Sequence, residues 1–249
     1  REIPNASWDN HLSLGAWIND GLDTQKSVGL YRFARSFDYW ETITKTFVSD
    51  TAAVTGGLGT LPGFSTFSHL TQVSDADAAG FTLTTQNSAG VNLSQEVPFY
   101  LCLKFAKAPD IALFDITIPD TGNYVETAPG FMPEFGMLFS MSGATTRAAP
   151  EFKDAGLGIT VFDTEQTRTV SYSSKNNVFT TAQKSIAAPQ LRLLSGNGGV
   201  GTLGGTVILE ESGWTIPITS AAAPILGFGL AFSSTAPLVY SETADIVSV

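Results

Sequence analysis

Apolar residues recur along the chain in short runs with the two-residue period of a β-strand. Between residues 99 and 105, Phe, Leu, Leu and Phe alternate with Tyr, Cys and Lys, so one face of an extended segment is apolar. Other alternating or wholly apolar runs predict further strands at residues 111–117, 137–141, 159–162, 169–172, 206–209, 214–218 and 225–232.

Turn-forming residues separate these runs. They form the sets Pro109-Asp110, 119–123 (PDTGN), 128–130 (APG) and 195–199 (SGNGG). Glycine reaches positive φ, proline fixes φ, and Asn and Asp bond to the local backbone. Short strands with turns about every ten residues are typical of sandwiches and jelly rolls. We therefore predict an all-β fold, a β-sandwich or jelly-roll-like structure built from two related β units.

Residues 30–47 carry two competing patterns. Their apolar and aromatic residues recur at spacings of three and four, which fits one face of a helix. The same stretch alternates through Tyr31, Phe33 and Phe37, and it is rich in β-favouring Thr and Val. We favour a strand, with a short helix as the alternative.

The chain contains an internal repeat. Residues 56–63 (GGLGTLPG) recur as residues 198–205 (GGVGTLGG), an offset of 142 (198 minus 56) with six of eight positions identical. Each copy is followed by an acidic turn that leads into an aromatic residue, at 75–83 and 210–216, and then by an apolar run. Three features in the same order favour an internal duplication.

The repeat suggests a division of the chain. We predict an N-terminal arm over residues 1–24, a first β unit over 25–107, bridging strands over 108–154, and a second β unit with a C-terminal tail over 155–249. The arm carries Trp8 and Trp17 but few strand signals. Exposed aromatic residues require a partner to cover them, so we expect the arm to reach a neighbouring subunit. No flexible linker is expected, because residues 108–157 contain apolar runs.

Composition excludes several classes of protein. The net charge is −10, with 43% hydrophobic and only 14% charged residues. Disorder requires low hydrophobicity and high charge. Nucleic-acid binding requires clustered Lys and Arg, and the sequence has no basic run. No stretch approaches the roughly 18 consecutive apolar residues of a membrane helix. We therefore expect neither a nucleic acid nor a membrane among the partners.

Cysteine and histidine are too few to indicate a site. The single cysteine, Cys102, excludes an intramolecular disulfide and a Cys-based zinc cluster, and its surroundings favour a small buried apolar group. The two histidines, His11 and His69, form no H-x-x-x-H pair, and no G-x-S-x-G motif is present. A Ser-His-Asp site would have to be assembled in space around one of them. We interpret both as ordinary core or surface histidines.

The glycine-rich and acidic motifs also favour structural roles. Residues 196–201 (GNGGVG) match G-x-G-x-x-G, but no helical pattern follows to hold a pyrophosphate, so a hairpin loop is preferred. The acidic pairs are Asp75 with Asp77, Glu210 with Glu211, and Glu151 with Asp154. Glycosidase carboxylates usually come from separate strands, and two of these pairs occupy matching turns of the repeat. Asp75 and Asp77 begin a calcium-loop pattern that alanines then interrupt. We predict no catalytic residue, no cofactor and no metal.

Several segments together suggest a family. They are residues 130–139 (GFMPEFGMLF), 156–159 (GLGI), 171–175 (SYSSK), 191–194 (LRLL), 196–201 (GNGGVG), 213–216 (GWTI) and 226–232 (LGFGLAF). In this order they resemble Gly/Ser/Thr-rich β proteins from the structural modules of tailed bacteriophages. These proteins are capsid decoration, head-fibre or tail-associated components. The resemblance covers about residues 130–233, contains no catalytic motif and transfers no functional residue.

The resemblance implies a non-enzymatic structural virion protein. A capsid decoration (cement) or head-fibre component is favoured, located on the particle exterior, homo-oligomeric and bound to other virion proteins. The alternative is a tail- or fibre-associated protein or a glycan-binding adhesin module, which would bind a host-surface glycan through exposed aromatic and polar loop residues. A glycan hydrolase that uses Asp and Glu on a β scaffold is less favoured. It stays a candidate because a sandwich fold alone does not define a function.

Overall fold

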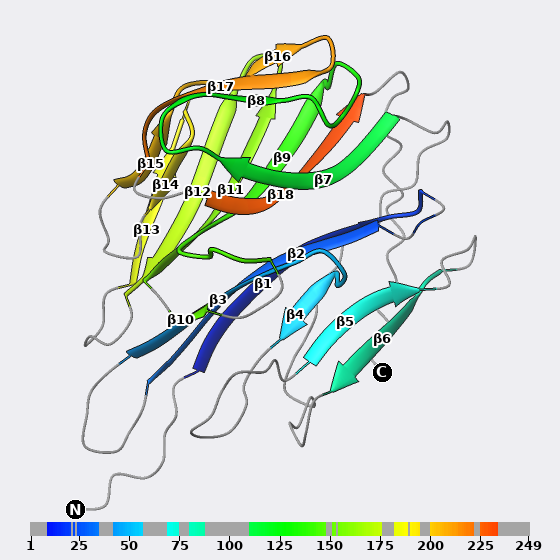
Figure 1. Ribbon diagram of the computed structural model, residues 1–249, viewed down its shortest axis with the longest axis vertical. Helices are drawn as coiled ribbons and strands as arrows, with labels where there is room; N and C mark the ends of the chain where they lie inside the picture. The colour runs from blue at the N-terminus through cyan, green and yellow to red at the C-terminus, as the bar shows by residue number, and fades with distance from the viewer. Residues whose placement is uncertain are drawn as a thin grey trace, which may run out of the picture.

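The structure is a computed structural model. It describes residues 9–20, 22, 24–34, 42–56, 69–74, 80–87, 110–147, 151–152, 154–175, 182–188, 190–194, 200–221 and 225–233. Every regular element among these residues is a β-strand, and the strands form several antiparallel sheets (Figure 1). The prediction of an all-β fold of the sandwich type is confirmed.

Four sheets contain the described strands. The strands are β1 (Asp9–Ile18), β2 (Thr24–Ala34), β3 (Thr42–Ser49), β4 (Val54–Gly56), β5 (His69–Ser74), β6 (Thr82–Asn87), β7 (Asp110–Ile118), β8 (Gly122–Glu126), β9 (Phe135–Ser142), β10 (Glu151–Phe152), β11 (Ala155–Asp163), β12 (Thr167–Ser174), β13 (Ala182–Ala187), β14 (Arg192–Leu194), β15 (Val200–Gly204), β16 (Ile208–Glu210), β17 (Gly213–Ala221) and β18 (Ile225–Ser233). The sheet orders are β1-β2-β3-β10, β13-β12-β11-β9-β18-β7, β4-β5-β6, and β14-β15-β17-β16 with β8 paired to β17.

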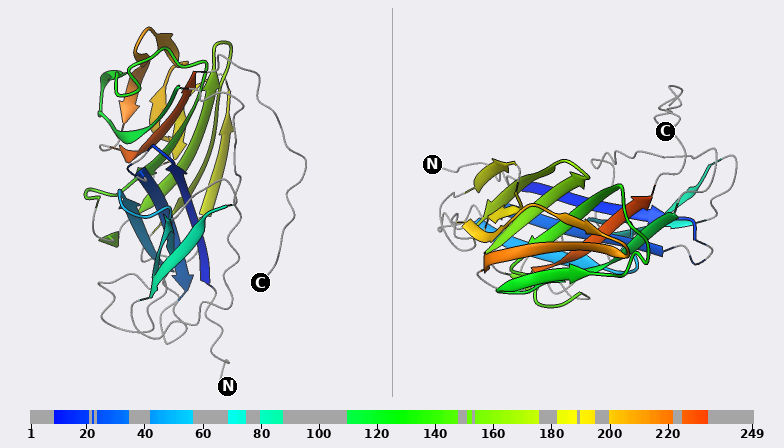
Figure 2. Two further views of the ribbon diagram at one scale, coloured as in Figure 1. Left: turned by 90° about the vertical axis from the view of Figure 1, so that its right-hand side faces the viewer. Right: turned by 90° about the horizontal axis from the view of Figure 1, so that it is seen from above.

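The six-stranded sheet is the central layer. The four-stranded sheet covers part of one face, and the sheet of β8 and β14–β17 covers the other (Figures 1 and 2). A strand that is buried on both faces is expected to be apolar at successive positions. Strand β18 follows this rule: Ile225 packs into one core, and Leu226 and Phe228 pack into the other.

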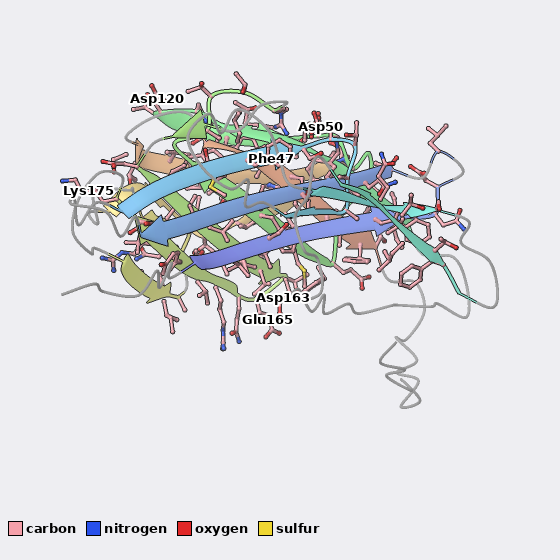
Figure 3. All side chains as sticks on the ribbon, turned by 90° about the horizontal axis from the view of Figure 1, so that it is seen from below. Phe47, Asp50, Asp120, Asp163, Glu165 and Lys175 are labelled. Atoms are coloured by element: carbon pink, nitrogen blue, oxygen red, sulfur yellow. The ribbon has the colours of Figure 1, made fainter. Side chains whose placement is uncertain are left out.

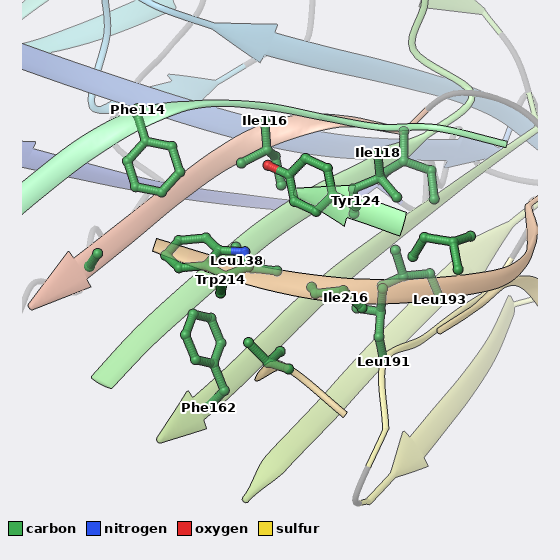
Figure 4. Packing of buried hydrophobic residues seen from close by; sticks show 14 residues of the cluster. Phe114, Ile116, Ile118, Tyr124, Leu138, Phe162, Leu191, Leu193, Trp214 and Ile216 are labelled. Atoms are coloured by element: carbon green, nitrogen blue, oxygen red, sulfur yellow. The ribbon is translucent and has the colours of Figure 1, made fainter. Parts of the chain in front are cut away.

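The first core lies between the six-stranded and five-stranded sheets, with Trp214 at its centre (Figure 4). The Trp214 ring is fully buried. Its centroid lies 5.3 Å from that of Phe114 and 4.9 Å from that of Phe162. Tilted and edge-on contacts of this kind add about 0.5–1.5 kcal/mol each beyond the burial of apolar area. Ile116 and Ile216 fill the space beside the rings.

The second core lies between the six-stranded and four-stranded sheets. Val28 and Val48 of the smaller sheet pack against Met141 and Leu157 of the larger one. Phe139 stacks on Phe228, with ring centroids 4.6 Å apart and planes inclined by 17°. The two cores share the central sheet, so strands β1–β3 and strands β17 and β18 belong to one packed body.

Small residues allow β14 to cross the central sheet closely. A Cβ atom on Gly156 would lie 2.0 Å from the Leu194 carbonyl oxygen. The Ser142 Oγ donates to that carbonyl at 3.2 Å, and the Ser171 Oγ donates to the Arg192 carbonyl at 3.1 Å. Serine and glycine therefore serve a packing role here, since buried carbonyl groups need hydrogen-bond donors.

Most predicted strands are confirmed. Those at 111–117, 137–141, 159–162, 169–172, 214–218 and 225–232 lie within β7, β9, β11, β12, β17 and β18. The run at 206–209 becomes a strand only from Ile208, at the start of β16. The described parts of 30–47 belong to strands β2 and β3, as favoured over the helix. The predicted strand at 99–105 lies outside the described residues.

The N-terminal segment requires a correction. Few strand signals were expected before residue 25, yet residues 9–18 form β1, which pairs with β2 along its whole length. Leu14, Ala16 and Ile18 alternate along β1 and pack against the second core. Gly15 and Trp17 stand between them, so the period of two was present in the sequence but was not marked by polar residues. Trp8 lies outside the described residues.

The predicted unit boundaries do not coincide with the sheets. Strands β7 and β9, from the bridging segment, share the central sheet with β11, β12, β13 and β18. The duplication itself stays a prediction, because residues 57–63 and 75–79 of the first copy lie outside the described residues.

Candidate functional site

Four charged side chains meet where the four-stranded sheet packs on β7. Lys26 of β2 lies with its Nζ 2.8 Å from the Asp115 Oδ1 of β7 and 3.9 Å from the Oδ1 of Asp50, which follows β3. The Nη1 of Arg147, in the segment after β9, lies 2.9 Å from the same Asp115 oxygen and 3.4 Å from the Asp50 oxygen. Lys26 is only 8% exposed. We call these four residues the ion cluster.

Arg147 also binds backbone. Its Nη1 donates to the Gly227 carbonyl at 2.9 Å, and its Nη2 donates to the Ile116 carbonyl at 2.5 Å. Gly227 and Ile116 are partners in the pairing of β18 with β7. The planar guanidinium offers several donors in fixed directions, and here it joins two strands of the central sheet to the two aspartates.

The two carboxyl groups of the ion cluster influence each other. Partial burial, the negative charge of Asp115 and a hydrogen bond with Asp115 raise the pKa of Asp50, while Lys26 and Arg147 oppose the rise. Glycosidase carboxyl groups stand about 5–5.5 Å apart in retaining enzymes and about 6.5–9.5 Å in inverting ones. Here both carboxylates are instead paired with the same two cations, Lys26 and Arg147. The arrangement is suited to holding two sheets together.

A buried tyrosine hydroxyl is also bound to a neighbouring carboxylate. The Tyr124 hydroxyl donates to the Glu126 carboxylate, and Tyr124 is 6% exposed. Burial, followed by the hydrogen bond and charge of Glu126, raises the pKa of Tyr124 well above its ordinary value. The phenol therefore stays protonated at neutral pH and is unsuited to act as a base.

The structure separates the residues that the sequence analysis singled out. His11 lies in β1 and His69 in β5, which belong to different sheets. Glu151 lies in β10, and Asp154 lies just before β11. Glu210 and Glu211 are exposed at the β16–β17 turn, where the Glu210 Oε1 accepts a hydrogen bond from the Thr215 hydroxyl at 2.5 Å.

Other candidates lie outside the described part of the chain. Asp75, Asp77, Cys102 and residues 195–199 are among them. The glycine-rich loop leads into strand β15 and not into a helix, as the hairpin interpretation expects. Within the described residues, no group of three or more His, Cys, Asp or Glu side chains is placed to hold a metal ion.

The sequence analysis missed the ion cluster. Its members are spread from residue 26 to residue 147, so no local motif connects them. The available signal was an aspartate within the apolar run 111–117.

A second feature is an uncovered part of the central sheet. One cross-strand row contains Ile186, Val170, Ile159, Phe139 and Phe228 in register. Phe228 is fully buried beneath the four-stranded sheet, whereas Val170 is 51% exposed and Ile186 is 75% exposed. The four-stranded sheet thus stops short of the β12–β13 side. Six of the exposed and half-buried apolar residues on this face form what we call the apolar band: Phe135, Met137, Ile159, Val161, Val170 and Ile186.

Charged residues border the apolar band at the β11–β12 turn. Arg168 is exposed on the same face, and its Nε and Nη2 donate to the Gln166 Oε1 at 3.0 and 2.6 Å. The Asp163 carboxylate accepts from the Glu165 and Gln166 amides at 2.8 and 2.7 Å, which lowers its pKa. Seen from the side of the four-stranded sheet, Asp163 and Glu165 lie together at the margin of the molecule, beyond β1 (Figure 3).

No known protein family, no curated protein and no solved structure matches this chain. None of the described residues belongs to a helix of the length and apolar character needed to cross a membrane.

Proposed function

We propose that this protein is a non-enzymatic structural component of a tailed-phage virion, a capsid decoration or head-fibre protein on the particle exterior. The observation that supports it best is the apolar band. Contiguous exposed apolar surface marks a place where another protein binds. The resemblance of residues 130–233 to phage structural proteins supplies the virion as the setting.

The charged residues fit the same proposal. In the ion cluster each cation binds both aspartates, and Arg147 also binds two strand carbonyls. These contacts join layers of the fold. A rigid body with an exposed apolar surface suits a protein that assembles with copies of itself and with other virion proteins.

The surface offers less support for a glycan-binding module. Among the large hydrophobic side chains that the described residues expose, Phe135 is the aromatic one, at 36% exposure. Sugar-binding sites generally present aromatic faces with polar groups beside them. The adhesin alternative would therefore depend on residues outside the described part of the chain.

Immunogold labelling of candidate phage particles tests the proposal. Antibody against the purified chain is expected to label the outside of the head. Labelling of the tail would contradict decoration and favour a tail- or fibre-associated protein. A chain that labels no particle but binds a glycan array would contradict the structural proposal and favour the adhesin. Turnover of a glycan, lost on replacement of one carboxylate, would establish a hydrolase.

A further inference from the structure

We infer that the apolar band is the contact surface between two copies of this chain, related by a two-fold axis parallel to β11 and β12. The axis lies above the space between these two strands, so β12 of each copy packs on β11 of the other. The inference deepens the proposed function and rests on it only for the setting in which the copies meet.

The register of the sheet defines the apolar part of this contact. Val170 and Ile159 are directly opposite each other on β12 and β11. Rotation about an axis parallel to the strands keeps each residue at its own level along the strands. Val170 of one copy therefore lies on Ile159 of the other, and the 51% of Val170 that is exposed becomes buried. Ile186, directly opposite Val170 on β13, extends the same row outward.

Charge complementarity favours a second copy as the occupant. Arg168 is opposite Val161, and Asp163 lies two residues further along β11 on the same face. The two-fold axis brings each Arg168 close to Asp163 and Glu165 of the other copy. Within its own chain, the Arg168 guanidinium donates to the Gln166 side-chain oxygen, and its charge helps to lower the pKa of Asp163; among the described residues no carboxylate lies within ion-pair distance of it. Two symmetric sets of charge pairs would result.

The same charges explain why this face is selected. A chain with a net charge of −10 repels a copy of itself over most of its surface. At the apolar band, the cation Arg168 and the anions Asp163 and Glu165 lie beside apolar side chains. The same surface on a second copy therefore offers charges of opposite sign to each of them. An isologous two-fold contact requires this property.

The first test measures the mass of the full chain by light scattering and sedimentation equilibrium over a range of concentrations. The unaltered chain is expected to dimerise. Val170→Asp is expected to weaken the dimer by at least ~tenfold, because a buried unpaired charge is costly. Val125→Asp is the matched control: Val125 is 55% exposed on β8, in the five-stranded sheet, and its replacement should leave the dimer intact. Circular dichroism and thermal unfolding verify that both variants fold.

A charge exchange tests the axis without a change in the apolar residues. Arg168→Glu should weaken the dimer, and the double variant Arg168→Glu/Glu165→Arg should restore it, because each substitution recreates the pair across the axis. A chain that is monomeric at every concentration would overturn the inference. The inference would also be overturned if Val125→Asp and Val170→Asp weakened the dimer equally. It would be overturned too if the double variant dimerised no more strongly than Arg168→Glu.

The interface and the proposed function can fail separately. A monomeric chain that still labels phage heads would overturn the interface and leave the function standing. A dimer with the expected variant behaviour that labels no particle would support the interface and overturn the function.

Discussion

At the scale of single residues, Asp50 of the ion cluster makes the stability of the fold depend on pH. The pKa of Asp50 is raised, chiefly by partial burial and then by Asp115. A carboxyl group whose pKa is raised in the folded state binds more protons there than in the unfolded chain, where the pKa is about 3.8. Its contribution to the free energy of unfolding therefore increases as pH falls through the folded pKa toward about 4.

Asp50→Asn tests this sign. The variant should remove the part of the stability gain that Asp50 supplies between neutral pH and about pH 4. Urea titrations at several pH values measure it. Asp163→Asn is the control with the opposite sign: the pKa of Asp163 is lowered by the Glu165 and Gln166 amides, so it stabilises at neutral pH and this stability is lost in acid. Identical pH profiles for Asp50→Asn and the unaltered chain would contradict the assignment.

Lys26 should be more important for stability than its exposed counterparts. Lys26→Met removes one cation from two carboxyl groups in contact, so like-charge repulsion between Asp50 and Asp115 increases. The partners are 36% and 44% exposed, so water screens part of the effect, and we expect a loss of about 2 kcal/mol in the free energy of unfolding. Glu211→Gln, at the exposed β16–β17 turn and away from the apolar band, is the control, with a change within about 0.5 kcal/mol. A near-neutral Lys26→Met would show that the cluster contributes nothing.

At the scale of elements, strands were predictable where one face is apolar over several residues. Strands β7, β9, β11, β12, β17 and β18 meet this condition. Strand β1 was missed although Leu14, Ala16 and Ile18 alternate, because tryptophan and glycine between them obscured the pattern. Which strands pair was not predictable, because pairing depends on residues far apart: β7 pairs with β18, more than one hundred residues away. The ion cluster depends on that pairing and was hidden for the same reason.

Close crossing of β14 over β11 gives a prediction for one glycine. Gly156→Ala places a Cβ atom 2.0 Å from the Leu194 carbonyl oxygen, a backbone atom that cannot rotate away. The strands must separate, and the Ser142 hydrogen bond to that carbonyl must lengthen. We expect a loss of about 2 kcal/mol, within the usual range for overpacking. Chemical denaturation measures it, and an unchanged midpoint would show that β14 is free to lift from the sheet.

At the scale of the whole molecule, the central sheet belongs to two cores. The sandwich type of fold could be predicted from the sequence, since strands alone were expected. The third layer of the fold could not be predicted, because the sequence does not show which sheet packs on the apolar face of which other sheet. In β18 the neighbours Ile225 and Leu226 enter different cores. A strand with both faces apolar indicates burial on both sides, and this signal was present at 225–232.

The shared sheet predicts that the described layers unfold together. Ile216→Ala affects the first core and Val28→Ala the second, and each deletes buried methyl groups at a cost of about 2–4 kcal/mol. The chain has three other tryptophans, so the measurement uses a background in which Trp8, Trp17 and Trp40 are replaced by phenylalanine and Trp214 alone reports, on the first core. If the cores are coupled, Val28→Ala lowers the midpoint seen by Trp214 fluorescence as much as the midpoint seen by far-UV circular dichroism. Ile208→Ala, at a site 54% exposed, is the control and should leave both midpoints unchanged. A Trp214 transition that does not move in Val28→Ala would instead mean that the two cores are independent, and that the four-stranded sheet can detach while the first core stays folded.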